Sequence, residues 1–162
     1  MEFLRAIENS GLASWVRESP TIWAYPTIIF LHGVGMGFLV GMNTVIALRL
    51  LGFAPGLPVA PMGKFFSFMY LGFWINAASG LLLLIADATT FLTNPLFYLK
   101  MSLIALALVN IQFLKKTVYA DPLPDMVPVP MTGKVLAGVS LFLWVGAITA
   151  GRLTAYIGNP AK

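Results

Sequence analysis

Four long apolar stretches dominate the pattern of the chain. They cover about residues 22–51, 65–87, 95–116 and 134–158, and charged side chains are rare inside them. At about 1.5 Å of rise per residue, each stretch is long enough as a helix to cross a hydrocarbon layer of about 30 Å. The pattern therefore predicts four membrane-spanning helices.

The first eighteen residues have a different pattern. Apolar residues recur there at helical spacing, and charged residues fall largely between them; the apolar set is Phe3, Leu4, Ile7, Leu12, Trp15 and Val16. Such a pattern is typical of a helix that lies in the membrane interface. We therefore expect an all-α fold: a membrane four-helix bundle with an N-terminal interfacial amphipathic helix at 1–18, forming one integral membrane domain over 1–162.

Composition supports lipid as the solvent. Hydrophobic residues make up 59% of the 162 residues and charged residues only 10%, whereas soluble domains carry about 25% charged residues. The formal net charge of +4 comes from Lys and Arg scattered singly between apolar runs, which argues against a nucleic-acid-binding surface. The bilayer is the first predicted partner, and other membrane subunits or a second copy are the next.

Two residue counts limit the chemistry. The chain has no cysteine, which excludes disulfides, a thiolate nucleophile, cysteine-ligated clusters and c-type haem attachment. Its single histidine is His32. A zinc or copper site with several histidines from one chain is excluded, and bis-histidine haem would need a second subunit.

The distribution of cations predicts an orientation. The connectors between the first and second and between the third and fourth spans are flanked by Arg49, Lys64, Lys115, Lys116 and Lys134. Cytoplasmic loops are enriched in Lys and Arg. We therefore expect a multi-pass protein with both termini outside the cytoplasm, which is the periplasm if the membrane is a bacterial inner membrane.

Small residues predict where helices pack closely, because close backbone approach stabilises helix pairs in lipid. The expected packing positions are Gly33, Gly37 and Gly41 in the first span, Gly72 and Gly80 around Asn76 in the second, and Ala147, Gly151 and Ala155 in the fourth.

Ionisable residues from four helices are expected at one depth. His32, Lys100 and Arg152 each lie five or six residues inside a predicted helix end, about 8–9 Å below the same surface. Asp87 ends the second span on that side. Ionisable groups within spanning helices are costly unless paired or hydrated, so this cluster is a candidate site.

Structural and functional interpretations of the cluster both remain open. Lys100 and Arg152 can extend to the interface, Asp87 can neutralise one of them, and His32 can bond a neighbouring hydroxyl or carbonyl. Alternatively, His32 is an axial haem ligand, another metal ligand or a quinone contact.

A cofactor such as haem b or a quinone would draw on further residues. Gly35 would leave space for a flat macrocycle, Lys100 and Arg152 would bind propionates or quinone oxygens, and Met101 is the candidate sixth ligand. Five-coordinate haem, or haem shared across a homodimer, would also suit a single histidine.

Two segments carry a family resemblance. The stretch WAYPTIIFLHGVGMGFLVGMNTVIALRLLG (23–52) resembles the first helix of an uncharacterised family of small bacterial four-helix membrane proteins. GFWINAASGLLLLIADATTFLTNPLFYLKM (72–101) is similar to that family's second and third helices. More distantly, the histidine-bearing helix resembles those of copper-resistance D-type proteins and cytochrome b-type subunits, which implies a redox or metal-handling role.

Three functions follow from these observations. The first is a small subunit of an electron-transfer system, cytochrome b-like, that contacts haem or quinone through His32. The second is a non-catalytic accessory or anchor subunit of a membrane complex, and the third is a small ion or metal transporter. An independent enzyme is not indicated, because no nucleophile, carboxylate pair or phosphate-binding loop is present.

Overall fold

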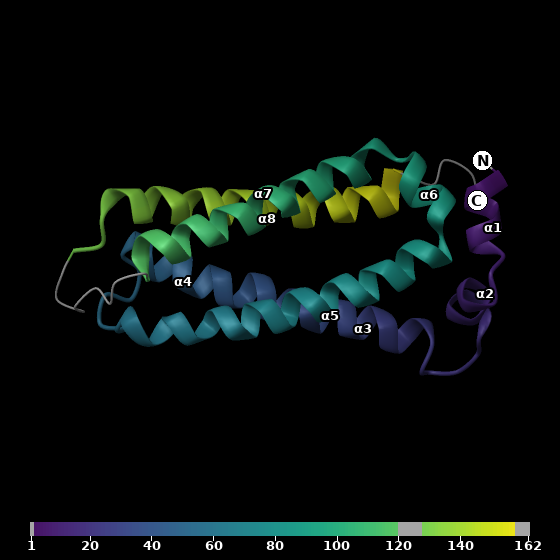
Figure 1. The fold of residues 1–162 in the computed structure, drawn as a ribbon, viewed down its shortest axis with the longest axis horizontal. Coiled ribbons are helices and arrows are strands. Elements are labelled where there is room, and N and C mark those ends of the chain that lie inside the picture. Colours follow the sequence, from purple (N-terminus) through teal and green to yellow (C-terminus); the bar gives the residue numbers. More distant parts are fainter. Residues whose placement is uncertain (1, 120–127, 158–162) are drawn as a thin grey trace.

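The computed structural model describes residues 2–119 and 128–157, and these residues form helices joined by turns (Figure 1). Four of the helices are long and apolar enough to cross a membrane: Tyr25–Leu51, Ala60–Ala86, Pro95–Val118 and Met131–Thr154. The predicted all-α membrane four-helix bundle is therefore confirmed, and the chain is a multi-pass membrane protein.

The first spanning helix changes its winding in the middle. It consists of α3 (Tyr25–Met36), the π-helical turn η1 (Gly37–Gly41) and α4 (Met42–Leu51). It begins three residues later than predicted, with a proline in its first turn, where the missing N–H costs nothing. It ends at Gly52, whose φ of 104° is left-handed; only glycine adopts this conformation without strain.

The second and third spanning helices follow a short connector. The second is the 3₁₀ turn η2 (Ala60–Lys64) continued by α5 (Phe65–Ala86), and the short α6 (Ala88–Thr93) leads to α7 (Pro95–Val118). The side chain of Asn94 caps α7, accepting a hydrogen bond from the Leu96 N–H at 2.9 Å. An asparagine N-cap followed by a proline at the first helical position is a typical start of a helix.

The fourth spanning helix, α8 (Met131–Ile157), begins three residues earlier than the predicted 134. Residue 158, the predicted end, lies outside the described residues, as do residues 120–127 of the connector that precedes this helix.

The predicted N-terminal helix is divided in two. Ser10 separates α1 (Glu2–Glu8) from α2 (Gly11–Glu18) because its hydroxyl accepts a hydrogen bond from the Ala13 N–H at 3.3 Å and caps the second helix. Serine is among the preferred N-cap residues.

Hydrogen bonds attach this N-terminal pair to the end of α5 and the start of α6. The Arg17 guanidinium donates to the Ala86 carbonyl at 3.1 Å, and the Thr89 N–H donates to the Glu8 carboxylate at 2.6 Å. The segment therefore covers one end of the bundle.

The spanning helices form two pairs, α3–α4 with α5 and α7 with α8. Figure 1 shows the pairs running close together at the α4 end and diverging toward α6 and α2. The main buried cluster lies in the α4 half and includes Ile46, Leu50, Phe66 and Leu114. A smaller cluster of Val16, Ile28 and Ala86 joins α2, α3 and α5 at the other end. The half that carries His32 thus lies outside the main core.

Candidate functional site

His32 lies in the contact between α3 and α5. Its Nδ1 is 3.1 Å from the backbone oxygen of Asn76 and 3.1 Å from Oγ of Ser79. A carbonyl oxygen only accepts, so Nδ1 carries the hydrogen. The Ser79 hydroxyl donates to the Ile75 carbonyl at 2.6 Å and can accept from His32. The neutral imidazole therefore keeps its free lone pair on Nε2.

Two further contacts on α5 hold His32 in place. The Asn76 side-chain amide donates to the His32 backbone oxygen at 2.8 Å, so the two residues bond one another in both directions. The imidazole also packs on Gly80: a Cβ at Gly80 would lie 3.0 Å from His32 Cε1. The ring orientation is therefore set by the α3–α5 contact.

Gly35 does not provide the open space expected beside His32. A Cβ on Gly35 would lie 2.6 Å from the Asn76 backbone nitrogen and 2.8 Å from the Gly72 oxygen. From the other side, a Cβ on Gly72 would lie 2.7 Å from the Gly35 oxygen. The backbone of α5 fills the place that a flat macrocycle would need, and Gly35 and Gly72 form the crossing point of the two helices.

Lys100 lies on the other helix pair. Its side chain is half-buried and extends along Gly151 of α8, where a Cβ would lie 3.4 Å from Lys100 Cδ and 3.7 Å from Nζ. Of the ionisable residues in the predicted cluster, His32 and Lys100 are half-buried.

The other predicted site residues lie at the surface. Met101 is 47% exposed, Arg152 is exposed near the end of α8, and Asp87 is exposed at the junction of α5 and α6. Within the described ranges, no hydrogen bond or ion pair connects Arg152 or Asp87 to His32, and the recorded ion pair joins Arg17 to Glu18. The equal depth predicted for these residues does not bring them into direct contact.

The sequence analysis missed Ser79. The spacing of the sequence could have identified it, because Asn76, Ser79 and Gly80 fall at i, i+3 and i+4 within an apolar helix and so lie on one face. A polar position on a glycine-bearing face indicates a helix contact rather than a lipid contact.

The described residues do not form a metal centre of three or more side-chain ligands. In residues 2–119 and 128–157, no group of three or more His, Asp or Glu side chains is positioned to hold a metal ion.

Comparison with other proteins gives no family. No family model matches the chain, and neither a characterised protein nor a solved structure is similar enough to count as a match.

Proposed function

We propose that this chain is a small membrane subunit of a bacterial electron-transfer system and that His32 contacts a quinone. The observation that carries the proposal is the imidazole itself, whose Nδ1–H is held by the Asn76 carbonyl and the Ser79 hydroxyl. A histidine fixed in this way presents a base at Nε2. The end that carries His32 is then periplasmic, as are both termini.

A haem seated on the Gly35 side of His32 does not fit the chain. The α5 backbone would lie 2.6–2.8 Å from even one added carbon there, and the candidate sixth ligand, Met101, is 47% exposed. A quinone needs only a hydrogen-bond partner at one oxygen, so the single histidine suffices. The distant resemblance to cytochrome b-type subunits supports the electron-transfer role and not a haem site at Gly35.

His32, Lys100 and the pair Asn76 and Ser79 have different roles in the proposed quinol oxidation. A quinol that donates a hydrogen bond to His32 Nε2 would pass one of its two protons to that nitrogen and the other to water, while its two electrons leave for a redox centre in a partner subunit. The ammonium of Lys100 stabilises negative charge that develops on the quinone oxygen. Asn76 and Ser79 keep the imidazole oriented throughout.

The variant His32→Asn tests this proposal. The asparagine amide retains a donor where Nδ1 stood, so the bonds to α5 can persist, but Nε2 is lost. We expect a soluble quinol analogue to bind purified protein at least about tenfold more weakly, which corresponds to one hydrogen bond to an ionisable group. Tryptophan fluorescence quenching measures the affinity, and thermal unfolding provides the control for folding.

Two results would contradict the proposal. One is an unchanged affinity in His32→Asn, which would reduce His32 to a packing residue. The other is a Soret band in the absorbance spectrum of the pure protein, which would replace the quinone by haem.

An accessory or anchor subunit is the second candidate. Large aromatic side chains are exposed on the outer faces of α5 and α8, among them Trp74 at 68% and Phe142 at 75%. Aromatic residues are enriched at protein–protein interfaces. Co-purification of a partner in mild detergent, lost when Trp74 and Phe142 are replaced by Leu, would support this function.

A further inference from the structure

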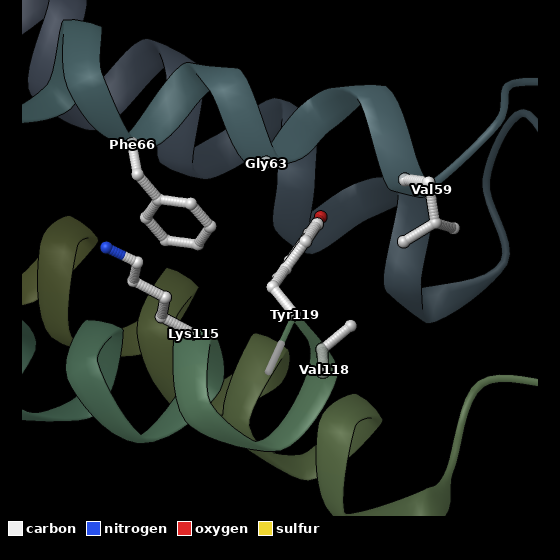
Figure 2. A pocket seen from close by; sticks show the side chains of 7 residues that line it. Val59, Gly63, Phe66, Lys115, Val118 and Tyr119 are labelled. Atoms are coloured by element: carbon white, nitrogen blue, oxygen red, sulfur yellow. The ribbon is translucent and has the colours of Figure 1, made fainter. Parts of the chain in front are cut away.

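A cavity lies at the end of the bundle opposite His32. It has a volume of about 220 Å³, is open on one side, and lies between η2, the first turn of α5 and the last turn of α7 (Figure 2). Its lining includes Val59, Gly63, Phe66, Lys115, Val118 and Tyr119. Pockets for drug-sized molecules occupy roughly 300–1,000 Å³, so this one suits a small group.

Tyr119 brings an unsatisfied hydroxyl to this cavity. Its ring lies against Gly63, where a Cβ would be 3.4 Å from Tyr119 Cδ1, and meets the Phe66 ring edge-on at 5.2 Å. The hydroxyl is buried, and no described residue forms a hydrogen bond with it. Figure 2 shows it directed between Gly63 and Val59. Burial raises the pKa of Tyr119 to about 12, so the group remains a hydrogen-bond donor at neutral pH.

Lys115 supplies a positive charge to the same cavity. Its ammonium lies 5.6 Å from the centre of the Phe66 ring and 5.5 Å from that of Tyr70. Cation–π contacts at this distance hold the charge in place while leaving its N–H donors available. Figure 2 shows the ammonium beside the Phe66 ring, on the side away from Tyr119.

The surrounding charge favours an anion. The other cations of this end are Arg49, Lys64, Lys116 and Lys134, while the acidic residues of the described part of the chain, Glu2, Glu8, Glu18 and Asp87, belong to the opposite end. Asp121 and Asp125 fall in the segment outside the described residues. A basic pocket between the ends of spanning helices is a typical head-group site.

We propose that this cavity binds the phosphodiester head group of an anionic phospholipid, with Lys115 contacting the phosphate and the Tyr119 hydroxyl donating to a head-group oxygen. The site lies where η2 begins one spanning helix and α7 ends another, which is the level of the head groups. The apolar lining, with Phe66 and Val118, suits the glycerol and the first acyl carbons.

The test compares lipids and matched variants in detergent. Phosphatidylglycerol, phosphatidylcholine and inorganic phosphate are titrated against the full chain, and native mass spectrometry measures bound lipid. A lysine near the membrane surface contributes about 1 kcal/mol to anionic lipid binding, so Lys115→Gln should weaken phosphatidylglycerol binding about fivefold. Lys116→Gln removes the same charge outside the cavity and should change the affinity less than twofold.

Tyr119→Phe removes only the hydroxyl and should weaken binding without a change of charge. Equal losses in Lys115→Gln and Lys116→Gln would overturn the site, because they would indicate general surface attraction. Unchanged binding in Tyr119→Phe, equal binding of phosphatidylcholine, or displacement of the lipid by inorganic phosphate at the lipid's own concentration would also overturn it. None of these outcomes depends on the quinone contact at His32.

Discussion

The crossing of α3 and α5 makes Gly35→Ala the most informative single substitution. The new methyl carbon would lie 2.6 Å from the Asn76 nitrogen, 2.8 Å from the Gly72 oxygen and 3.1 Å from the Asn76 Cα. All three atoms belong to the backbone, so no side chain can turn away to make room. The two helices must move apart.

The expected cost follows from two effects. Overpacking a well-packed contact costs about 1–3 kcal/mol. Separation also weakens the two hydrogen bonds between His32 and Asn76, each worth about 0.6 kcal/mol in a membrane. Together they predict a loss of about 2–4 kcal/mol in the free energy of unfolding.

Gly33→Ala is the matched control, because nothing lies within 4 Å of a Cβ at Gly33 on the same helix. Alanine is favoured over glycine in a helix by about 0.5–1 kcal/mol, and this gain applies to both variants. The difference between them therefore isolates the crossing. Unfolding in mixed detergent, followed by tryptophan fluorescence, measures both free energies, and equal stability of the two variants would refute the close approach.

Two other substitutions test buried polar groups. Ser140→Ala removes the 2.9 Å hydrogen bond from the Ser140 hydroxyl to Asn43 Oδ1 and should lower the free energy of unfolding by about 0.6–1.7 kcal/mol. Unfolding in mixed detergent measures this loss, and Ser102→Ala, at an exposed serine, is the control. An unchanged free energy of unfolding in Ser140→Ala would contradict a structural role for this pair. Tyr119→Phe should reduce the dependence of stability on alkaline pH. In the unfolded chain a tyrosine deprotonates near its usual pKa of 10.0, whereas in the folded protein Tyr119 deprotonates only near 12. The wild type therefore loses stability as pH rises between these values, and the variant does not. Thermal unfolding from pH 9 to 12 checks this, and parallel profiles would contradict it.

Sequence periodicity was sufficient to predict the spanning helices because the surrounding lipid offers the backbone no hydrogen-bond partners. Backbone groups in hydrocarbon must be satisfied within the segment, so each apolar stretch of sufficient length becomes a helix. The caps at Asn94 and Gly52 then depend on local chemistry. The division between α1 and α2 at Ser10 was missed because an amphipathic pattern continues across a short break.

Helix contacts were harder to predict than helices. Gly33, Gly37 and Gly41 repeat every four residues, yet nothing lies within 4 Å of a Cβ at any of them, and the expected packing face was wrong. The glycine in contact is Gly35, on the opposite side of the helix. Glycine spacing identifies a face that permits close approach, but the rotation of the helix against its neighbour decides which face is used.

The residues of the candidate site were hard to predict for the same reason, because the rotation of each helix against its neighbours is not given by the sequence. Depth along a helix can be read from the sequence. The side of the helix on which a residue lies relative to its neighbours cannot be read from the sequence in the same way. Arg152 and Met101 are exposed in the structure.

The division of the bundle into two unequal halves bears on the proposed quinone contact at His32. The main buried cluster packs both helix pairs together in the α4 half, and there the buried polar pair Asn43–Ser140 is fixed by neighbours. In the other half, His32 is bound to α5 while Lys100 lies against α8 on the second pair. A ligand that bonds both would connect the two pairs where the protein's own core does not. Binding at His32 should therefore stabilise the diverging ends more than the α4 half, a difference that hydrogen exchange can resolve helix by helix.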